Sequence, residues 1–317
     1  MNIAKTLYAG RQYDAVYTPD VVFAHRETGD LTLQLVSPVP PALPRKVAQT
    51  PVTAKFARWG RALVPPPADP GRFPLIVDCP GSGWAGADGH AHVPYLVDLA
   101  RNGFVAASVS YRGTYRDDVV FPAAVQDLLE AVRFLRANAE VFHIDPDRVA
   151  LMGDSSGGNT AAMAAVCEDT EFIIGDHRDQ STVVKACCCV YAPVDMVNLV
   201  QDRIDERKTL RPDEAPFPEG VPFEAMEIWQ EQYLSDPEGY MRRASPLHRI
   251  ERTPPFLFIQ GDDDPIIPMA QGLRFCDALR EKGGRAEFVK VAGGEHGASV
   301  WTRETLDCIV QFFRAYV

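Results

Sequence analysis

The stretch RVALMGDSSGGNTAAMAAV, residues 148–166, is the part of the chain from which the fold can be inferred. Residues 149–152 form an unbroken apolar run, which is typical of a strand buried on both faces of a parallel sheet. Residues 153–157 then read G-x-S-x-G, and an alanine-rich segment with good helix propensity follows directly. The pentapeptide alone also arises by chance, so the prediction depends on its flanks. A strand, a sharp turn and a helix in this order predict a nucleophile elbow that presents Ser155 in a strained backbone conformation.

Length and composition place the chain among globular proteins. It has 317 residues, of which 46% are hydrophobic and 24% charged, so we expect one large α/β domain spanning 1–317 with a small cap. The net charge of −11 argues against binding to nucleic acid or to an anionic membrane surface. No run approaches the roughly 18 apolar residues of a membrane span.

Two further features bear on the compartment. The first residues lack the apolar core of a signal peptide. The seven cysteines are an odd number without C-x-x-C pairs, and three of them form the run 187–189 inside an apolar segment. Reduced, buried thiols fit this pattern, so we expect a cytoplasmic protein.

Predicted strands and helices alternate along most of the chain. Residues 16–25 and 31–37 predict an antiparallel pair, and the alternation from residue 75 onward predicts a mostly parallel sheet flanked by helices. Residues 144–148 predict a turn before the strand that leads to Ser155. The remaining predicted strands are 75–79, 105–110, 183–193, 256–260 and 286–291, and the long predicted helices are 90–101, 122–138 and 300–316.

Two segments depart from this alternation. Residues 38–74 hold ten prolines and predict a long irregular connection. Residues 196–245 predict a cap insertion, rich in charge and proline over 202–222, with a helix near 222–234. One face of that helix carries Phe223, Met226, Trp229 and Tyr233, which either pack onto the core or line a pocket.

A serine nucleophile needs a base, and the base needs an orienting acid. Asp264 follows the predicted strand 256–260, and His296 follows the predicted strand 286–291. The chain order serine, aspartate, histidine is that of the α/β-hydrolase fold. We therefore predict a catalytic triad of Ser155, Asp264 and His296.

Other residues compete for these roles. Asp262 and Asp263 adjoin Asp264, and Asp195 follows the preceding strand, so each is an alternative acid. His248 lies before the acid-bearing strand and is a poor alternative base. His90 and His92 form H-x-H, but the sequence near them has no cysteine or carboxylate cluster, so we predict no metal site.

Several stretches make the chain resemble the α/β-hydrolase carboxylesterases, especially the hormone-sensitive-lipase-like group and the bacterial feruloyl and acetyl-xylan esterase-like group. The resemblance runs from about residue 73 to the C-terminus, and residues 1–72 match no pattern of these groups. The stretches that carry it are PGSGW (80–84), SVSYRG (108–113), FPAAVQDLLEAVRFLRANA (121–139), IDPDRVALMGDSSGGNTA (144–161), ASPLHRI (244–250), PPFLFIQGDDDPIIP (254–268) and GGEHG (293–297).

The resemblance also implies an oxyanion hole. In these groups an H-G-G-G loop supplies backbone N–H donors, and the matching positions here give the amides of Ser82 and Gly83, joined by the amide of Ser156. The chain departs from the motif at two positions, because Pro80 replaces the histidine and Ser82 replaces a glycine.

These observations predict a serine carboxylesterase that works through an acyl-enzyme without a metal or an organic cofactor. We expect its partner to be a small-molecule ester with a short acyl or a hydroxycinnamoyl (feruloyl-type) group, and we leave a homo-oligomer open. Trp84 and Trp229 are the candidate substrate-binding residues. An amidase, formamidase or oligopeptidase would use the same triad, whereas a non-catalytic binding protein of this fold should have lost part of it.

Overall fold

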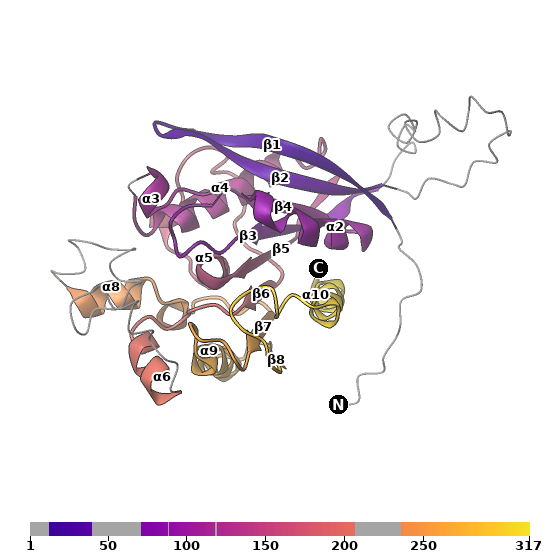
Figure 1. Ribbon diagram of the computed structural model, residues 1–317. Coiled ribbons are helices and arrows are strands. Elements are labelled where there is room, and N and C mark those ends of the chain that lie inside the picture. The colour runs from indigo at the N-terminus through magenta and orange to yellow at the C-terminus, as the bar shows by residue number, and fades with distance from the viewer. Residues whose placement is uncertain (1–12, 40–70, 88, 118, 207–235) are drawn as a thin grey trace, which may run out of the picture.

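The computed structural model describes residues 13–39, 71–87, 89–117, 119–206 and 236–317. Its described strands form a single eight-stranded sheet in the order β1-β2-β4-β3-β5-β6-β7-β8 (Figure 1). The strands are β1 (Asp14–Arg26), β2 (Gly29–Val39), β3 (Phe73–Cys79), β4 (Val105–Val109), β5 (Ile144–Asp154), β6 (Cys187–Val190), β7 (Phe256–Gly261) and β8 (Ala286–Val291). The α-helices are α2 (Val93–Arg101), α3 (Thr114–Asp117), α4 (Ala123–Ala137), α5 (Ser155–Val166), α6 (Leu199–Asp205), α8 (Pro237–Arg243), α9 (Met269–Glu281) and α10 (Arg303–Tyr316). The 3-10 turns are η2 (His90–His92), η3 (Thr170–Phe172) and η4 (Pro246–Arg249).

The sheet has an antiparallel edge and a parallel body. β1 pairs with β2 and β2 with β4 in antiparallel register. Every pairing from β4 through β3 and β5 to β8 is parallel. The predicted α/β architecture, a mostly parallel sheet flanked by helices, is confirmed.

Two hydrophobic layers sandwich the sheet. Alternate residues of β5 belong to different layers: Val149 and Leu151 pack with α4, α5 and α9, whereas Ala150 and Met152 pack with α2 and α10. This two-sided burial explains why the central strands read as continuous apolar runs rather than alternating ones.

Some boundaries differ from the sequence-based prediction. Residues 144–148 belong to β5, but the register with β3 jumps from Ile144 to Val149, so the predicted turn survives as an irregularity within the strand. The helix expected at 300–316 begins at Arg303, because the Thr302 side chain accepts a hydrogen bond from the Thr305 amide and caps it.

Parts of the two irregular segments lie outside the described residues. Of the proline-rich connection 38–74, positions 40–70 are not described. Of the insertion 196–245, the described ends contain α6 and α8, and the helix expected near 222–234 falls in the undescribed part. The cap therefore stays a prediction.

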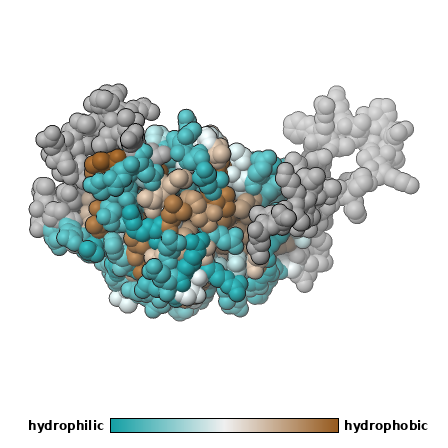
Figure 2. All heavy atoms as spheres, turned by 90° about the horizontal axis from the view of Figure 1, so that it is seen from below, coloured by the Kyte–Doolittle hydropathy of each residue, from teal (hydrophilic) through white to brown (hydrophobic). Residues whose placement is uncertain are grey.

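Most large apolar side chains lie inside the molecule. Seen from below, the surface is largely hydrophilic around a smaller hydrophobic area (Figure 2). Among the described residues, no helix combines the length and the apolar character that crossing a bilayer requires.

The close approach of α5 to β3 depends on glycine. A Cβ atom on Gly157 would lie 2.0 Å from the carbonyl oxygen of Cys79, and one on Gly158 would lie 2.7 Å from the Cβ of Ala192. Backbone cannot move aside as a side chain does, so Gly157 is the less replaceable of the two.

We predict that Gly157→Ala lowers the free energy of unfolding by about 1–3 kcal/mol or more, because the methyl group forces α5 away from β3. Alanine is otherwise favoured over glycine within a helix by roughly 1 kcal/mol, so a loss reports the steric clash. Urea unfolding measures it, with Gly158→Ala as the milder comparison. Equal stability of wild type and Gly157→Ala would contradict the packing described here.

Candidate active site

Ser155 occupies the junction of β5 and α5. Its φ angle is +50°, a left-handed conformation that is costly for a residue with a side chain, by about 1–3 kcal/mol. Asp154, the last residue of β5, is still extended, and Ser155 already begins the helix. The chain thus reverses over a single residue, which brings the Ser155 hydroxyl to the carboxyl edge of the sheet as the sequence predicted.

Two loops at the same edge bring a base and an acid to this serine. His296 follows β8, and its Nε2 lies 2.9 Å from the Ser155 Oγ. Asp264 follows β7, and its Oδ2 lies 2.9 Å from the His296 Nδ1. With Nδ1 protonated, the imidazole donates to Asp264 and leaves Nε2 free to accept the serine proton.

The Asp264 side chain is held from several sides. It is fully buried. Its Oδ1 accepts the amides of Ile266 and Ile267 at 2.8 and 2.9 Å, and its Oδ2 also accepts the Gln260 side-chain amide at 2.9 Å. These donors fix the carboxylate in the orientation that the histidine requires.

The alternative acids lie elsewhere. Asp262 accepts the Gly293 amide and pairs with Lys290, and Asp263 is exposed. Asp195 is buried against Arg274, with 2.6 Å between the charged atoms, and His248 lies 3.4 Å from the same carboxylate. Of the four candidate acids, the structure brings only Asp264 to His296.

Hydrogen bonds hold three successive residues of the loop after β3. The Tyr111 hydroxyl donates to the Pro80 carbonyl at 2.6 Å, the Gly81 amide donates to Asp154 Oδ1 at 2.6 Å, and the Ser82 amide donates to Ser156 Oγ at 2.9 Å. Tyr111 thus supports the loop at the position where the related motif has a histidine.

One of these hydrogen bonds removes a donor from the expected oxyanion hole. Because the Ser82 amide donates to Ser156 Oγ, it is not free to receive an oxyanion as predicted. The Gly83 amide has no acceptor within the part of the chain that the structure describes, and the Ser156 amide lies in the first turn of α5, where no intrahelical acceptor exists. Gly83 and Ser156 are therefore the two candidate donors.

A second group of side chains surrounds the triad. The Tyr191 hydroxyl donates to Asp154 Oδ2 at 3.0 Å and accepts from the Trp301 indole at 2.7 Å, and its ring centroid lies 4.5 Å from that of His296. Burial, followed by the charge of Asp154, raises the pKa of Tyr191, so its hydroxyl stays protonated. No sequence pattern indicates this contact, although Asp154 lies within the G-x-S-x-G motif.

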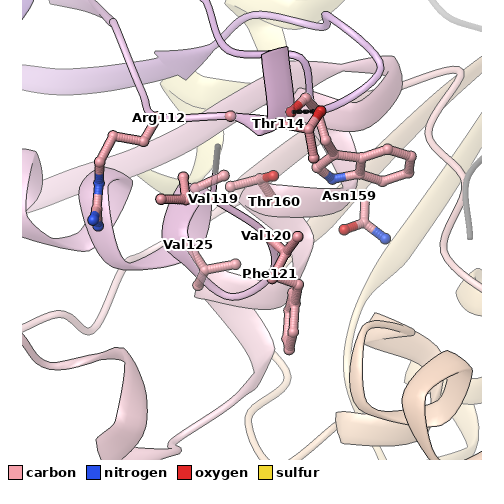
Figure 3. Close-up of a pocket in the computed structure, with 11 residues that line it drawn as sticks. Arg112, Thr114, Val119, Val120, Phe121, Val125, Asn159 and Thr160 are labelled. Atoms are coloured by element: carbon pink, nitrogen blue, oxygen red, sulfur yellow. Dashed lines mark hydrogen bonds between the residues drawn. The ribbon is translucent and has the colours of Figure 1, made fainter. Parts of the chain in front are cut away.

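Trp84 faces an apolar crevice next to the site. The crevice has a volume of about 10 Å³. In Figure 3, Asn159 and Thr160 of α5 lie across from Val120 and Phe121. Asn159 is one helical turn from Ser155 and so shares its side of α5. Trp229, the other predicted substrate residue, lies outside the described residues.

The two histidines of the H-x-H pair lie in different surroundings. His90 lies 3.4 Å from Asp20 near the surface, whereas His92 is buried with its Nδ1 2.9 Å from Asp78. Within the described ranges, no group of three or more His, Cys, Asp or Glu side chains is arranged to hold a metal ion.

Comparisons with known proteins agree with this geometry. A family model described as BD-FAE matches residues 63–279. Esterase LipQ of Mycobacterium tuberculosis (strain ATCC 25618 / H37Rv) is 25% identical over 256 residues, which are 78% of this chain and 56% of LipQ. The chain spans about half the length of the curated relatives it matches.

Two solved structures share the fold. A truncated carbohydrate esterase from gut microbiota superposes with a TM-score of 0.69 at 21% identity, covering 97% of this chain and 98% of that one. The butyrate-bound esterase Est2 of Thermogutta terrifontis gives a TM-score of 0.66 at 20% identity, with 96% and 94% covered. The fold is therefore that of these proteins, the α/β-hydrolase fold.

We predict that a fluorophosphonate probe forms a covalent adduct on Ser155, because this is the one of the three neighbouring serines whose hydroxyl contacts an imidazole. Tandem mass spectrometry of the labelled peptide locates the adduct. Ser155→Ala removes the nucleophile and should abolish labelling, whereas Ser82→Ala should not. An adduct on Ser82 or Ser156 in the wild-type protein would contradict the assignment.

Proposed function

The chain belongs to the BD-FAE family, and from this we propose that it is a serine carboxylesterase that acts through an acyl-enzyme. The observation that carries the proposal is the chain of 2.9 Å contacts from Ser155 through His296 to Asp264, set on a backbone held at φ +50°. LipQ, by its name an esterase, resembles most of the chain.

The proposed reaction has two halves. Ser155 Oγ attacks the ester carbonyl while His296 Nε2 takes its proton, and the amides of Gly83 and Ser156 receive the developing oxyanion. As the bond to the alcohol breaks, the imidazolium returns the proton to the leaving oxygen. In the second half a water loses its proton to His296 and attacks the acyl group, which releases the carboxylic acid and restores Ser155.

Asp264 acts through His296 in both halves. Its buried carboxylate keeps the proton on Nδ1 and stabilises the imidazolium that forms at each proton transfer. Because four donors hold Asp264, including His296 itself, the acid cannot turn away during the reaction.

The crevice beside Trp84 supports a short acyl group. Its lining includes Trp84, the residue after Gly83, and Asn159, one helical turn beyond Ser155. An acyl chain whose carbonyl oxygen accepts the Gly83 amide would therefore extend toward the crevice. Its volume of about 10 Å³ is close to the space that one water needs, which disfavours long acyl chains. Est2, a protein of the same fold, is described with butyrate bound.

A hydroxycinnamoyl group is the second candidate. Trp84 and Phe121 are aromatic residues that line the crevice, and a planar acyl ring that met either of them would gain about 0.5–1.5 kcal/mol per pair beyond area burial. An amidase, formamidase or oligopeptidase would use the same triad. A non-catalytic binding role is the least supported, because all three triad side chains are present and in contact.

We predict that Asp264→Asn lowers kcat for p-nitrophenyl acetate by about four orders of magnitude, because asparagine cannot stabilise the imidazolium and favours the wrong tautomer. Asp263→Asn is the matched control, being the same change one residue away on an exposed side chain. Steady-state kinetics on both variants measures the difference. A larger loss in Asp263→Asn would remove Asp264 from the proposed triad.

We also predict that acetyl to butyryl esters are the best substrates at fixed alcohol, and that Phe121→Ala shifts the optimum toward longer chains by enlarging the crevice. The readout is kcat/KM for acetyl, butyryl, octanoyl and hydroxycinnamoyl esters, with an anilide as the amide control. Ala124→Gly, on another wall of the crevice, is the control for a smaller increase in volume. A wild-type optimum at octanoyl would refute the short-acyl proposal.

A further inference from the structure

A buried histidine bridges two carboxylates behind the proposed oxyanion loop. His92, the last residue of η2, places its Nδ1 2.9 Å from Asp78 Oδ2 and its Nε2 3.5 Å from Asp154 Oδ1. Asp78 belongs to β3 and has a fully buried side chain, and those of His92 and Asp154 are 10% and 12% exposed. The three side chains thus connect the start of α2 with the ends of two central strands.

Asp154 connects this bridge to the catalytic machinery. It immediately precedes Ser155, and its Oδ1, the oxygen nearest to His92, accepts the Gly81 amide at 2.6 Å. Its Oδ2 accepts the hydroxyl of Tyr191, whose ring packs against His296. One carboxylate therefore contacts the oxyanion loop, adjoins the nucleophile and holds a neighbour of the base.

The two carboxylates need a positive charge. A buried carboxylate without a compensating partner is strongly destabilising. Among the described residues, His92 is the one basic side chain with a nitrogen within 4.0 Å of a carboxylate oxygen of Asp78 or Asp154. Apart from its contact with His92, Asp78 Oδ2 accepts a hydrogen bond from the Ser108 hydroxyl at 2.8 Å, and its Oδ1 lacks a partner within the described part of the chain.

We propose that His92 is a positioning residue for the reaction: as an imidazolium it neutralises Asp78 and Asp154, keeps the Asp154 carboxylate on the Gly81 amide, and so holds the loop of residues 80–83 where Gly83 can stabilise the oxyanion. His92 touches neither the substrate nor the triad in this role. The proposal rests on the esterase function proposed above.

Aromatic packing fixes the orientation of the imidazole. Its ring meets Tyr95 and Trp301 edge to face at centroid distances of 5.3 and 5.9 Å, and these two rings stack on each other at 4.3 Å. Trp301 in turn donates to the Tyr191 hydroxyl. The ring therefore keeps both nitrogens directed at the two carboxylates.

The charge state of His92 agrees with this role. Burial by itself lowers the pKa of His92, but the charges of Asp78 and Asp154 and the hydrogen bond to Asp78 outweigh it and raise the pKa to about 9. The other titratable groups that face the cluster are three tyrosines and two buried thiols, and burial raises the pKa of each: Tyr95, Tyr111, Tyr191, Cys79 and Cys188. Since the folded pKa of His92 lies above its ordinary value, the bridge is complete at neutral pH and is lost as the pH rises through about 9.

The test combines kinetics with a pH profile. His92→Gln removes the charge, and we expect kcat for p-nitrophenyl acetate to fall by about 10- to 100-fold at pH 7.5 with little change in KM, because a displaced oxyanion donor weakens binding of the transition state but not of the substrate. The rate of fluorophosphonate inactivation should fall in parallel. Wild-type kcat should decline as the pH rises through about 9, and this decline should be missing in His92→Gln.

His248→Gln is the matched control. His248 also places a ring nitrogen 3.4 Å from a buried carboxylate, that of Asp195, but the contacts of that carboxylate lead to Arg274 rather than to Gly81. We expect this variant to lose stability without losing kcat or the alkaline decline. Thermal unfolding of both variants separates a loss of folded protein from a loss of rate per folded molecule.

The outcomes separate the two proposals. A wild-type protein that neither hydrolyses esters nor reacts with the phosphonate contradicts the esterase function itself. An active wild type with kcat and the alkaline decline unchanged in His92→Gln overturns the positioning role alone. Should His92→Gln fail to fold, an NMR titration of the wild-type His92 imidazole replaces it: agreement with the alkaline decline of kcat supports the proposal, and disagreement overturns it.

Discussion

The reversal of the chain at Ser155 is the constraint on which the rest of the site depends. A buried strand must end and a buried helix must begin within one residue, and this requires Ser155 to adopt a left-handed backbone conformation. The tight junction leaves no space for side chains around it: a Cβ on Gly157 would meet the Cys79 carbonyl, and one on Gly81 would lie 2.8 Å from the Ser155 Cβ. The short distance between α5 and β3 also brings the loop after β3 to Ser155. The Gly83 and Ser156 amides and the Ser155 hydroxyl can then face one substrate carbonyl.

Asp154 has a second function in this arrangement. Its buried carboxylate contacts the loops after β3 and β6, and the loop after β8 packs against Tyr191 through His296. The carboxylate accepts the Gly81 amide and the Tyr191 hydroxyl, and the Tyr191 ring supports His296. The pKa of Asp154 is raised, because the effect of burial outweighs the opposing effect of the His92 charge. Asp154, the variable position before Ser155 in G-x-S-x-G, therefore helps to position the loops of the site.

Much of the fold followed from periodicity. The predicted strands that correspond to β5, β7 and β8 placed Ser155, Asp264 and His296 at the ends of strands, and the contacts among these three follow from parallel strands that share an edge. Contacts between distant segments could not be read in this way. Neither the Ser82 amide on Ser156 Oγ nor the bridge from His92 to Asp78 has a local pattern, because each depends on how two loops meet in space. Asp264 was predicted from the sequence with Asp262 and Asp263 as alternatives, and of these three aspartates the structure buries only Asp264 beside the imidazole.

The most direct test of the account is to trap the acyl group. Wild-type protein is mixed with an excess of p-nitrophenyl acetate and quenched in acid within the first turnovers, and the peptide that holds Ser155 and Ser156 is fragmented by mass spectrometry. We expect one acetyl group on Ser155 and a burst of nitrophenol that matches the amount of enzyme. Ester hydrolysis with no acetylated Ser155 at any quench time and no burst, or acetylation of Ser156 instead, would contradict the account.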